Sequence, residues 1–241
     1  MNAEALARAL AAARAEWELI GPTPRTASSR EPAQANAPEP QLGLWATAEA
    51  EPAGGSAEAH TRRKAHVAHN TGKYEWYTPA GIIEAAREVM GGIDLDPASC
   101  DAAQAVVKAE RYFTEEQDGL VQPWSGRLWM NPPYAQPLIT NFCYKLVHEL
   151  DAGHVEQAIA LTNNGTDTAW GQLLYSTCSA VCLPKGRVRF WAPDKKISAP
   201  LQGQMITYFG PATESFVHHF SPMGTISFPS PAADSPARSS R

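Results

Sequence analysis

The chain has 241 residues, four cysteines and a formal net charge of −5. This length suits one domain, and the acidic balance excludes binding of nucleic acid by a uniformly basic surface, so such binding requires a local patch. Charges near the start exclude a signal-peptide core, no apolar run is long enough to span a membrane, and the cysteines lack metal-ligand spacing, so we expect a cytoplasmic protein without a metal site.

Composition divides the chain into three predicted parts. Residues 1–70 are rich in Ala, Pro, Glu and Ser, and we predict an arm with a short helix followed by a disordered linker. Residues 71–228 carry most of the aromatic and β-branched side chains and form the predicted folded domain. Residues 229–241 are again Pro- and Ser-rich and form a predicted disordered tail.

The folded part is predicted to begin with a helix that Thr78 caps and in which Pro79 takes the first position. Apolar residues at helical spacing follow up to Met90, and Gly91 ends the helix. Further helices are predicted at 100–108, 138–150 and 168–175, and strands at 93–96, 111–113, 127–130, 157–161, 180–183, 204–209 and 225–228. This alternation predicts an α/β fold with a mostly parallel sheet and helices on both faces.

Ligands of such sheets bind beyond the carboxyl ends of the strands. That rule selects the residues after Asp96, after Met130 and after Leu161, where Asn163, Asn164, Thr166 and Asp167 are further candidates. The sharpest pattern is Asn131-Pro132-Pro133-Tyr134. Because two consecutive prolines donate no backbone hydrogen bonds, they end the strand in a stiff turn that leaves acceptor oxygens exposed. An ordinary proline turn is the alternative reading.

The turn fits chemistry on a planar amine, whose lone pair is delocalised and therefore poorly nucleophilic. Acceptors at the Asn131 amide oxygen and the Pro132 carbonyl would favour a tetrahedral nitrogen, and positioning would then supply the rate. Pro133 stiffens the turn, and Tyr134 is predicted to stack on the target base, which must leave the duplex to reach this pocket.

A basic run forms the candidate nucleic-acid contact. Lys185, Arg187 and Arg189 are predicted to hold phosphates, and Phe190 and Trp191 to stack on a displaced base. Lys195 and Lys196 extend the same run. A solvated hairpin is the alternative.

Seven stretches, in this order, resemble the phage-type, Dam-like DNA N6-adenine methyltransferases: 75–79, 93–99, 118–120, 129–134, 166–170, 185–190 and 208–210. The resemblance implies a class I methyltransferase (Rossmann-like) fold, S-adenosylmethionine as methyl donor, and adenine in double-stranded DNA as acceptor, in a bacterial or phage-infected cell.

The resemblance also implies the cofactor contacts. The segment beginning Asp96-Pro97 looks like the first cofactor motif of the family, although it lacks a Gly-x-Gly loop. Asp94 or Asp96 is expected near the methionine amino group or the ribose, and the other reading is a helix-capping role. Asp118 is expected to contact the cofactor adenine, or else to serve only a turn. Tyr77, Thr78 and Pro79 precede helix amides that would bind the methionine carboxylate.

Two alternatives remain open at the level of sequence. The same turn serves other planar amines, such as RNA purines or protein glutamine. A non-catalytic DNA-binding protein with a relic cofactor fold is a reading of a different class.

Overall fold

The computed structural model describes residues 77–192, 195–198 and 202–229, and three earlier positions. Those three, Ala11, Ala15 and Leu19, are helical and exposed. The rest of the predicted arm, and the predicted tail beyond Pro229, lie outside the described residues. The described residues all belong to one compact unit.

A seven-stranded sheet forms the centre of this unit, in the order β2-β1-β3-β4-β8-β5-β9, and β6 and β7 form a separate pair. In chain order the elements are α2 (Ala80–Met90), β1 (Leu95–Asp96), α3 (Asp101–Val107), β2 (Arg111–Tyr112), β3 (Gly126–Met130), α4 (Leu138–Asp151), β4 (Val155–Asn163), α5 (Ala169–Thr177), β5 (Ala180–Pro184), β6 (Phe190–Ala192), β7 (Lys195–Ser198), β8 (Gln204–Phe209), α6 (Thr213–Phe220) and β9 (Gly224–Ser227).

The sheet is mixed. Strands β2, β1, β3 and β4 pair in parallel, whereas β8 is antiparallel to both of its neighbours, β4 and β5. Strand β5 therefore runs with β4, and β9, which is antiparallel to β5, runs with β8. Five of the seven strands thus share one direction, so the predicted α/β class is confirmed, with β8 and β9 reversed.

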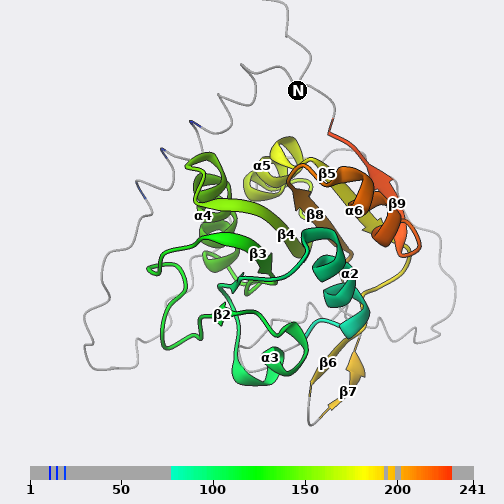
Figure 1. The fold of residues 1–241 in the computed structure, drawn as a ribbon, viewed down its shortest axis with the longest axis horizontal. Helices are drawn as coiled ribbons and strands as arrows, with labels where there is room; N and C mark the ends of the chain where they lie inside the picture. The colour runs from blue at the N-terminus through cyan, green and yellow to red at the C-terminus, as the bar shows by residue number, and fades with distance from the viewer. Residues whose placement is uncertain are drawn as a thin grey trace, which may run out of the picture. The chain divides into compact units, whose positions relative to one another are not determined.

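Helices cover both faces of the sheet, as predicted (Figure 1). Helices α4 and α5 pack on one face, and α2, α3 and α6 on the other. Strand β4 is buried on both sides, because Ala158 and Ala160 face the first cluster while Ile159 and Leu161 face the second. Among the described residues, no helix has the length and apolar character needed to cross a membrane.

Several predicted boundaries require correction. Helix α2 begins at Ala80, so Pro79 is its N-cap rather than its first residue, and no side chain caps it. Helix α6 was not predicted, because its only buried residues are Phe216 and Phe220, too few for a clear periodic pattern. The two rings stack, with centroids 4.6 Å apart, against α2 and the sheet.

The order of the strands creates a topological switch point. From β1 the chain passes through α3 to β2 on one side, and it then returns to β3 on the other side of β1. The chain direction across the sheet therefore switches between β1 and β3, and ligands of such sheets bind at the carboxyl ends of the strands at this point.

An ion pair closes the opposite end of the sheet. The Asp94 carboxylate accepts hydrogen bonds from the Arg127 backbone N–H (2.7 Å), from Arg127 Nε (2.9 Å) and from Arg127 Nη2. Arg127 Nη1 also donates to the Gly91 carbonyl at the end of α2 (2.6 Å). These bonds join the carboxyl end of α2 to the amino ends of β1 and β3. The guanidinium holds the pKa of Asp94 below its usual value.

We expect Asp94→Asn to lower the free energy of unfolding by about 1–3 kcal/mol at pH 7, because the charge-assisted bonds to Arg127 are lost. A carboxyl whose pKa is lowered on folding stabilises the protein above its unfolded pKa, near 3.8, and this stabilisation is lost as the pH falls through the folded value. The difference between wild type and variant should therefore shrink between pH 5 and pH 3. Urea unfolding across this range measures it, and a difference that does not change with pH contradicts the assignment.

Candidate active site

The Asn-Pro-Pro-Tyr turn follows directly on β3 and folds back on itself. The Tyr134 hydroxyl donates to Asn131 Oδ1 (2.9 Å) and lies 3.4 Å from the Leu161 carbonyl near the end of β4. The hydroxyl lies inside the protein, and this burial raises the pKa of Tyr134, so the group remains a donor. The turn is thereby anchored to the neighbouring strand.

This anchoring orients the acceptors. An amide oxygen accepts two hydrogen bonds, so Tyr134 occupies one position on Asn131 Oδ1 and fixes the direction of the other. Pro132, whose main-chain carbonyl is the second predicted acceptor, is buried. The ring of Tyr134 lines the cleft described below, while the predicted stacking on a base stays a prediction.

Asp96 ends β1 and is almost fully buried, with 2 % of its surface exposed. Its carboxylate accepts bonds from the Ala98 N–H (3.3 Å) and from Gln104 Nε2 (3.1 Å). Burial nevertheless raises the pKa of Asp96 to about 7. A cation beside this carboxylate would stabilise its charged form.

A glycine contact brings the Asp118 loop to the same place. A Cβ at Gly119 would lie 1.9 Å from the Pro97 carbonyl oxygen, so only glycine permits this approach. Asp118 adopts a positive φ of 51°, and its Oδ1 accepts the Leu120 N–H at 3.1 Å. Asp118 therefore serves the turn, and the turn lies against the end of β1.

The segment before α2 reaches this edge as well. Cys100 Sγ donates to the Tyr77 hydroxyl (3.3 Å), which joins the start of α2 to the chain just after β1. The first turn of α2 has no side-chain cap, and the position of Gly81 faces open space. The structure thus brings together the predicted segments at Tyr77, Asp96 and Asp118.

Asp94 is not part of this group. Its carboxylate is engaged by Arg127 at the amino end of β3, so of the two alternative aspartates only Asp96 lies at the carboxyl edge. The strand is only two residues long, and Asp94 precedes it.

A cleft of about 470 Å³ opens beside the turn at the carboxyl end of β4. It is lined by Tyr134, Gln136, Ile139, Asn163, Asn164, Gly165, Asp167, Thr168, Trp170, Arg187, Gln202 and Gly203. A Cβ at Gly203 would lie 2.9 Å from Asn164 Nδ2 and 3.3 Å from Arg187 Nη1, so this glycine lets both side chains approach the backbone.

The basic run divides between surface and core. Lys185, Arg187 and Arg189 are exposed, which suits contact with phosphates. Phe190 is only 4 % exposed and packs in the core, so it is a core residue rather than a base-stacking one. Trp191 is half-buried: its ring lies 5.0 Å from that of Tyr77, and its Nε1 donates to the Thr78 carbonyl (3.2 Å).

Sequence reasoning missed Gln204. It is the first residue of β8, and β8 is reversed, so its beginning lies where the parallel strands end. Gln204 is buried and contacts Asn163 (Nε2 to Oδ1, 3.3 Å). A rule that looks only after parallel strands cannot find it.

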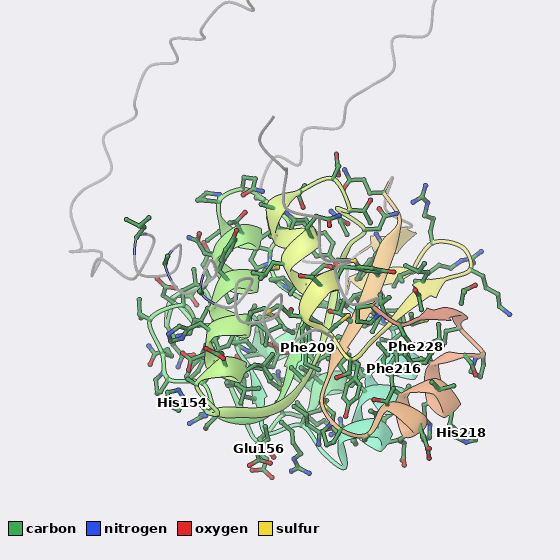
Figure 2. The ribbon with its side chains drawn as sticks, turned by 90° about the horizontal axis from the view of Figure 1, so that it is seen from above. His154, Glu156, Phe209, Phe216, His218 and Phe228 are labelled. Atoms are coloured by element: carbon green, nitrogen blue, oxygen red, sulfur yellow. The ribbon has the colours of Figure 1, made fainter. Side chains whose placement is uncertain are left out.

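His154 and His218 lie outside the cleft lining. Figure 2 shows His154 and Glu156 at the beginning of β4 and His218 on α6, all exposed. His154 Nδ1 lies 2.7 Å from Glu149 Oε2. In the part of the chain that the structure describes, no three His, Cys, Asp or Glu side chains gather as metal ligands.

These features define an α/β protein with a cleft at the carboxyl end of β4 and, beside it, a turn that Tyr134 anchors to the neighbouring strand. The chain belongs to the DNA N-6-adenine-methyltransferase (Dam) family, whose model matches residues 65–230.

Two phage proteins are similar, and both are named DNA N-6-adenine-methyltransferase. The protein of Haemophilus phage HP1 is 31 % identical over 96 residues, which cover 39 % of this chain and 53 % of the relative. The protein of Escherichia phage T1 is 29 % identical over 97 residues, which cover 39 % of this chain and 38 % of the relative. The chain thus spans about half or less of these relatives, and no solved structure matches it.

We expect Gly119→Ala to destabilise the fold by about 1–3 kcal/mol or more, because the new methyl group would collide with the Pro97 backbone, which cannot move aside like a side chain. Gly81→Ala is the matched control: it lies in α2 with nothing within 4 Å, so it should be neutral or stabilising. Thermal unfolding of both variants measures this. Equal melting temperatures for Gly119→Ala and wild type would show that Gly119 does not pack closely against the Pro97 backbone.

Proposed function

We propose that this protein transfers a methyl group from S-adenosylmethionine to the exocyclic amine of adenine in double-stranded DNA, on a class I methyltransferase-like fold. The observation that carries the proposal is the turn after β3, in which Tyr134 fixes the Asn131 amide oxygen beside the end of β4. Membership of the family, and the names of the two phage relatives, support the same activity.

The carboxyl edge fits the cofactor. The ammonium group of the cofactor would pair with the buried carboxylate of Asp96. This positive charge would lower the pKa of Asp96, which burial raises to about 7. The carboxylate of the cofactor would bind at the uncapped first turn of α2, after Tyr77, Thr78 and Pro79. The adenine amine of the cofactor would donate to Asp118, whose loop packs on Pro97. When bound, the cofactor supplies an electrophilic methyl group on sulfur.

The turn acts on the other substrate. Asn131 Oδ1 and the Pro132 carbonyl accept the two amine protons and draw the nitrogen out of conjugation with the ring, so its lone pair becomes available for in-line attack. Because Tyr134 already holds Asn131, this orientation costs no reorganisation during the reaction. The ring of Tyr134 then forms one side of the base pocket.

The exposed Lys185, Arg187 and Arg189 would contact phosphates near the displaced base. Arg187 lines the same cleft as Tyr134, so one of these cations would lie beside the proposed base pocket. Trp191, at the rim beside Tyr77, is the aromatic residue of the run that remains half-exposed.

The direct test is methylation of duplex DNA with a labelled cofactor, followed by digestion to nucleosides. N6-methyladenine as the labelled product supports the proposal. Parallel reactions that instead label cytosine, RNA or protein and leave DNA adenine unlabelled would show that the substrate is another planar amine. Cofactor binding without any labelled product would indicate a DNA-binding protein with a relic fold.

Asn131→Ala is expected to reduce the methylation rate by about a hundredfold or more, because one of the two acceptors for the amine is lost. Tyr134→Phe should cost less, since it removes the hydroxyl that orients Asn131 but keeps the ring. Cofactor affinity should stay near that of wild type in both variants. Single-turnover rates and cofactor titration measure this, and near-normal methylation by Asn131→Ala would show that the turn is not catalytic.

Arg187→Ala and Arg189→Ala should each reduce the slope of log DNA affinity against log salt by about one unit, because each removes one phosphate contact. The loss should be similar for specific and non-specific DNA. Lys108→Asn is the control, because it also removes a positive charge, here at the end of α3. The preceding residue, Val107, accepts a hydrogen bond from Arg87 of α2 at its carbonyl (2.6 Å). An unchanged slope combined with a lower melting temperature would assign the arginines to the fold instead.

A further inference from the structure

Two main-chain groups fix the side-chain amide of Gln204. Its Oε1 lies 3.4 Å from the Val188 N–H, which only donates, and its Nε2 lies 2.8 Å from the Gln202 carbonyl, which only accepts. Because neither main-chain group can exchange roles, the orientation of the Gln204 amide is determined. With 4 % of its surface exposed, this side chain is part of the interior.

Gln204 in turn orients Asn163. The two residues are partners across β4 and β8, so their side chains lie on the same face. Gln204 Nε2 donates its second proton to Asn163 Oδ1 at 3.3 Å. The oxygen of Asn163 is therefore turned toward Gln204, and its NH₂ group is the end available to the cleft that Asn163 lines.

We propose that the Asn163 NH₂ group donates a hydrogen bond to a ring nitrogen beside the amine of the displaced adenine, and that Gln204 is its positioning residue. This inference rests on the proposed function. The two atoms proposed to bind the amine, Asn131 Oδ1 and the Pro132 carbonyl oxygen, are both acceptors, so they recognise the amine protons alone. Both ring nitrogens that flank the adenine amine, N1 and N7, are acceptors, and a donor at Asn163 completes the pattern.

The spacing along β4 agrees with this assignment. The Tyr134 hydroxyl meets the strand at the Leu161 carbonyl, two residues before Asn163. Two residues of strand span about 6–7 Å, which leaves room for the edge of a base between the turn and Asn163. Tyr134 and Asn163 line one cleft, so both face the same ligand.

Substrate analogues test the bond directly. Duplexes carry 1-deazaadenine or 7-deazaadenine at the target position, in which N1 or N7 is replaced by CH and the amine is kept. We expect wild type to lose about 10–100-fold in kcat/KM on one of these analogues, because the Asn163 donor loses its acceptor. Asn163→Ala should lose a similar factor on adenine and should no longer discriminate between adenine and that analogue.

Two further variants separate positioning from folding. Asn163→Asp keeps the acceptor for Gln204 but puts a carboxylate oxygen toward the ring nitrogen, so kcat/KM on adenine should fall at least as far as in Asn163→Ala. Gln204→Met keeps the volume but frees Asn163, and it should lose part of the discrimination between adenine and the analogue. Glu156→Gln, exposed at the other end of the same strand β4, makes the reverse acid-to-amide change and should stay within about twofold of wild type.

The outcomes distinguish this inference from the function on which it rests. If wild type methylates adenine but treats both analogues like adenine, or if Asn163→Ala keeps the discrimination of wild type, the role of Asn163 is overturned and the proposed function stands. If wild type methylates no adenine, the proposed function fails and the inference fails with it. Melting temperatures and cofactor affinity near those of wild type for Asn163→Asp confirm that the fold is intact.

Discussion

The hydrogen bond from the Tyr134 hydroxyl to the Asn131 amide oxygen is the contact on which the proposed chemistry depends. Two prolines between these residues remove the backbone donors that would otherwise continue the strand, so the turn needs another source of rigidity. The buried hydroxyl supplies it, and its 3.4 Å approach to the Leu161 carbonyl ties the turn to the strand that contributes Asn163. An acceptor held in this way does not have to be reorganised when an amine arrives.

The two ends of the sheet differ in how far their charged and polar groups are satisfied within the protein. At the amino end, Arg127 binds Asp94 and the last turn of α2, so charged groups there are satisfied within the protein. At the carboxyl edge, Asp96 keeps a raised pKa, and the first turn of α2 has no side-chain cap. Polar groups that the fold leaves without full compensation gather at one edge, where a ligand can complete them.

Local patterns predicted what depends on neighbours in sequence. The apolar stripe of α2 and the strand before Asn131 followed from periodicity and from the prolines. The sequence could not predict that Asp94 pairs with Arg127, 33 residues away, or that the side chain of Phe190 is buried in the core. It also could not predict the position of Gln204, because the direction of β8 depends on pairing with β4, not on any motif in β8. Long-range pairing decides which polar residues meet.

Tyr77 and Trp191 form a short antiparallel bridge, with N–H···O distances of 2.8 and 3.0 Å in the two directions. One strand of this bridge leads into α2, and the other continues the segment that contains Arg187 and Arg189. A shift of either strand therefore displaces the other. At the proposed sites, this pair couples cofactor binding to DNA binding, so the factor by which the cofactor changes the affinity for DNA equals the factor by which DNA changes the affinity for the cofactor.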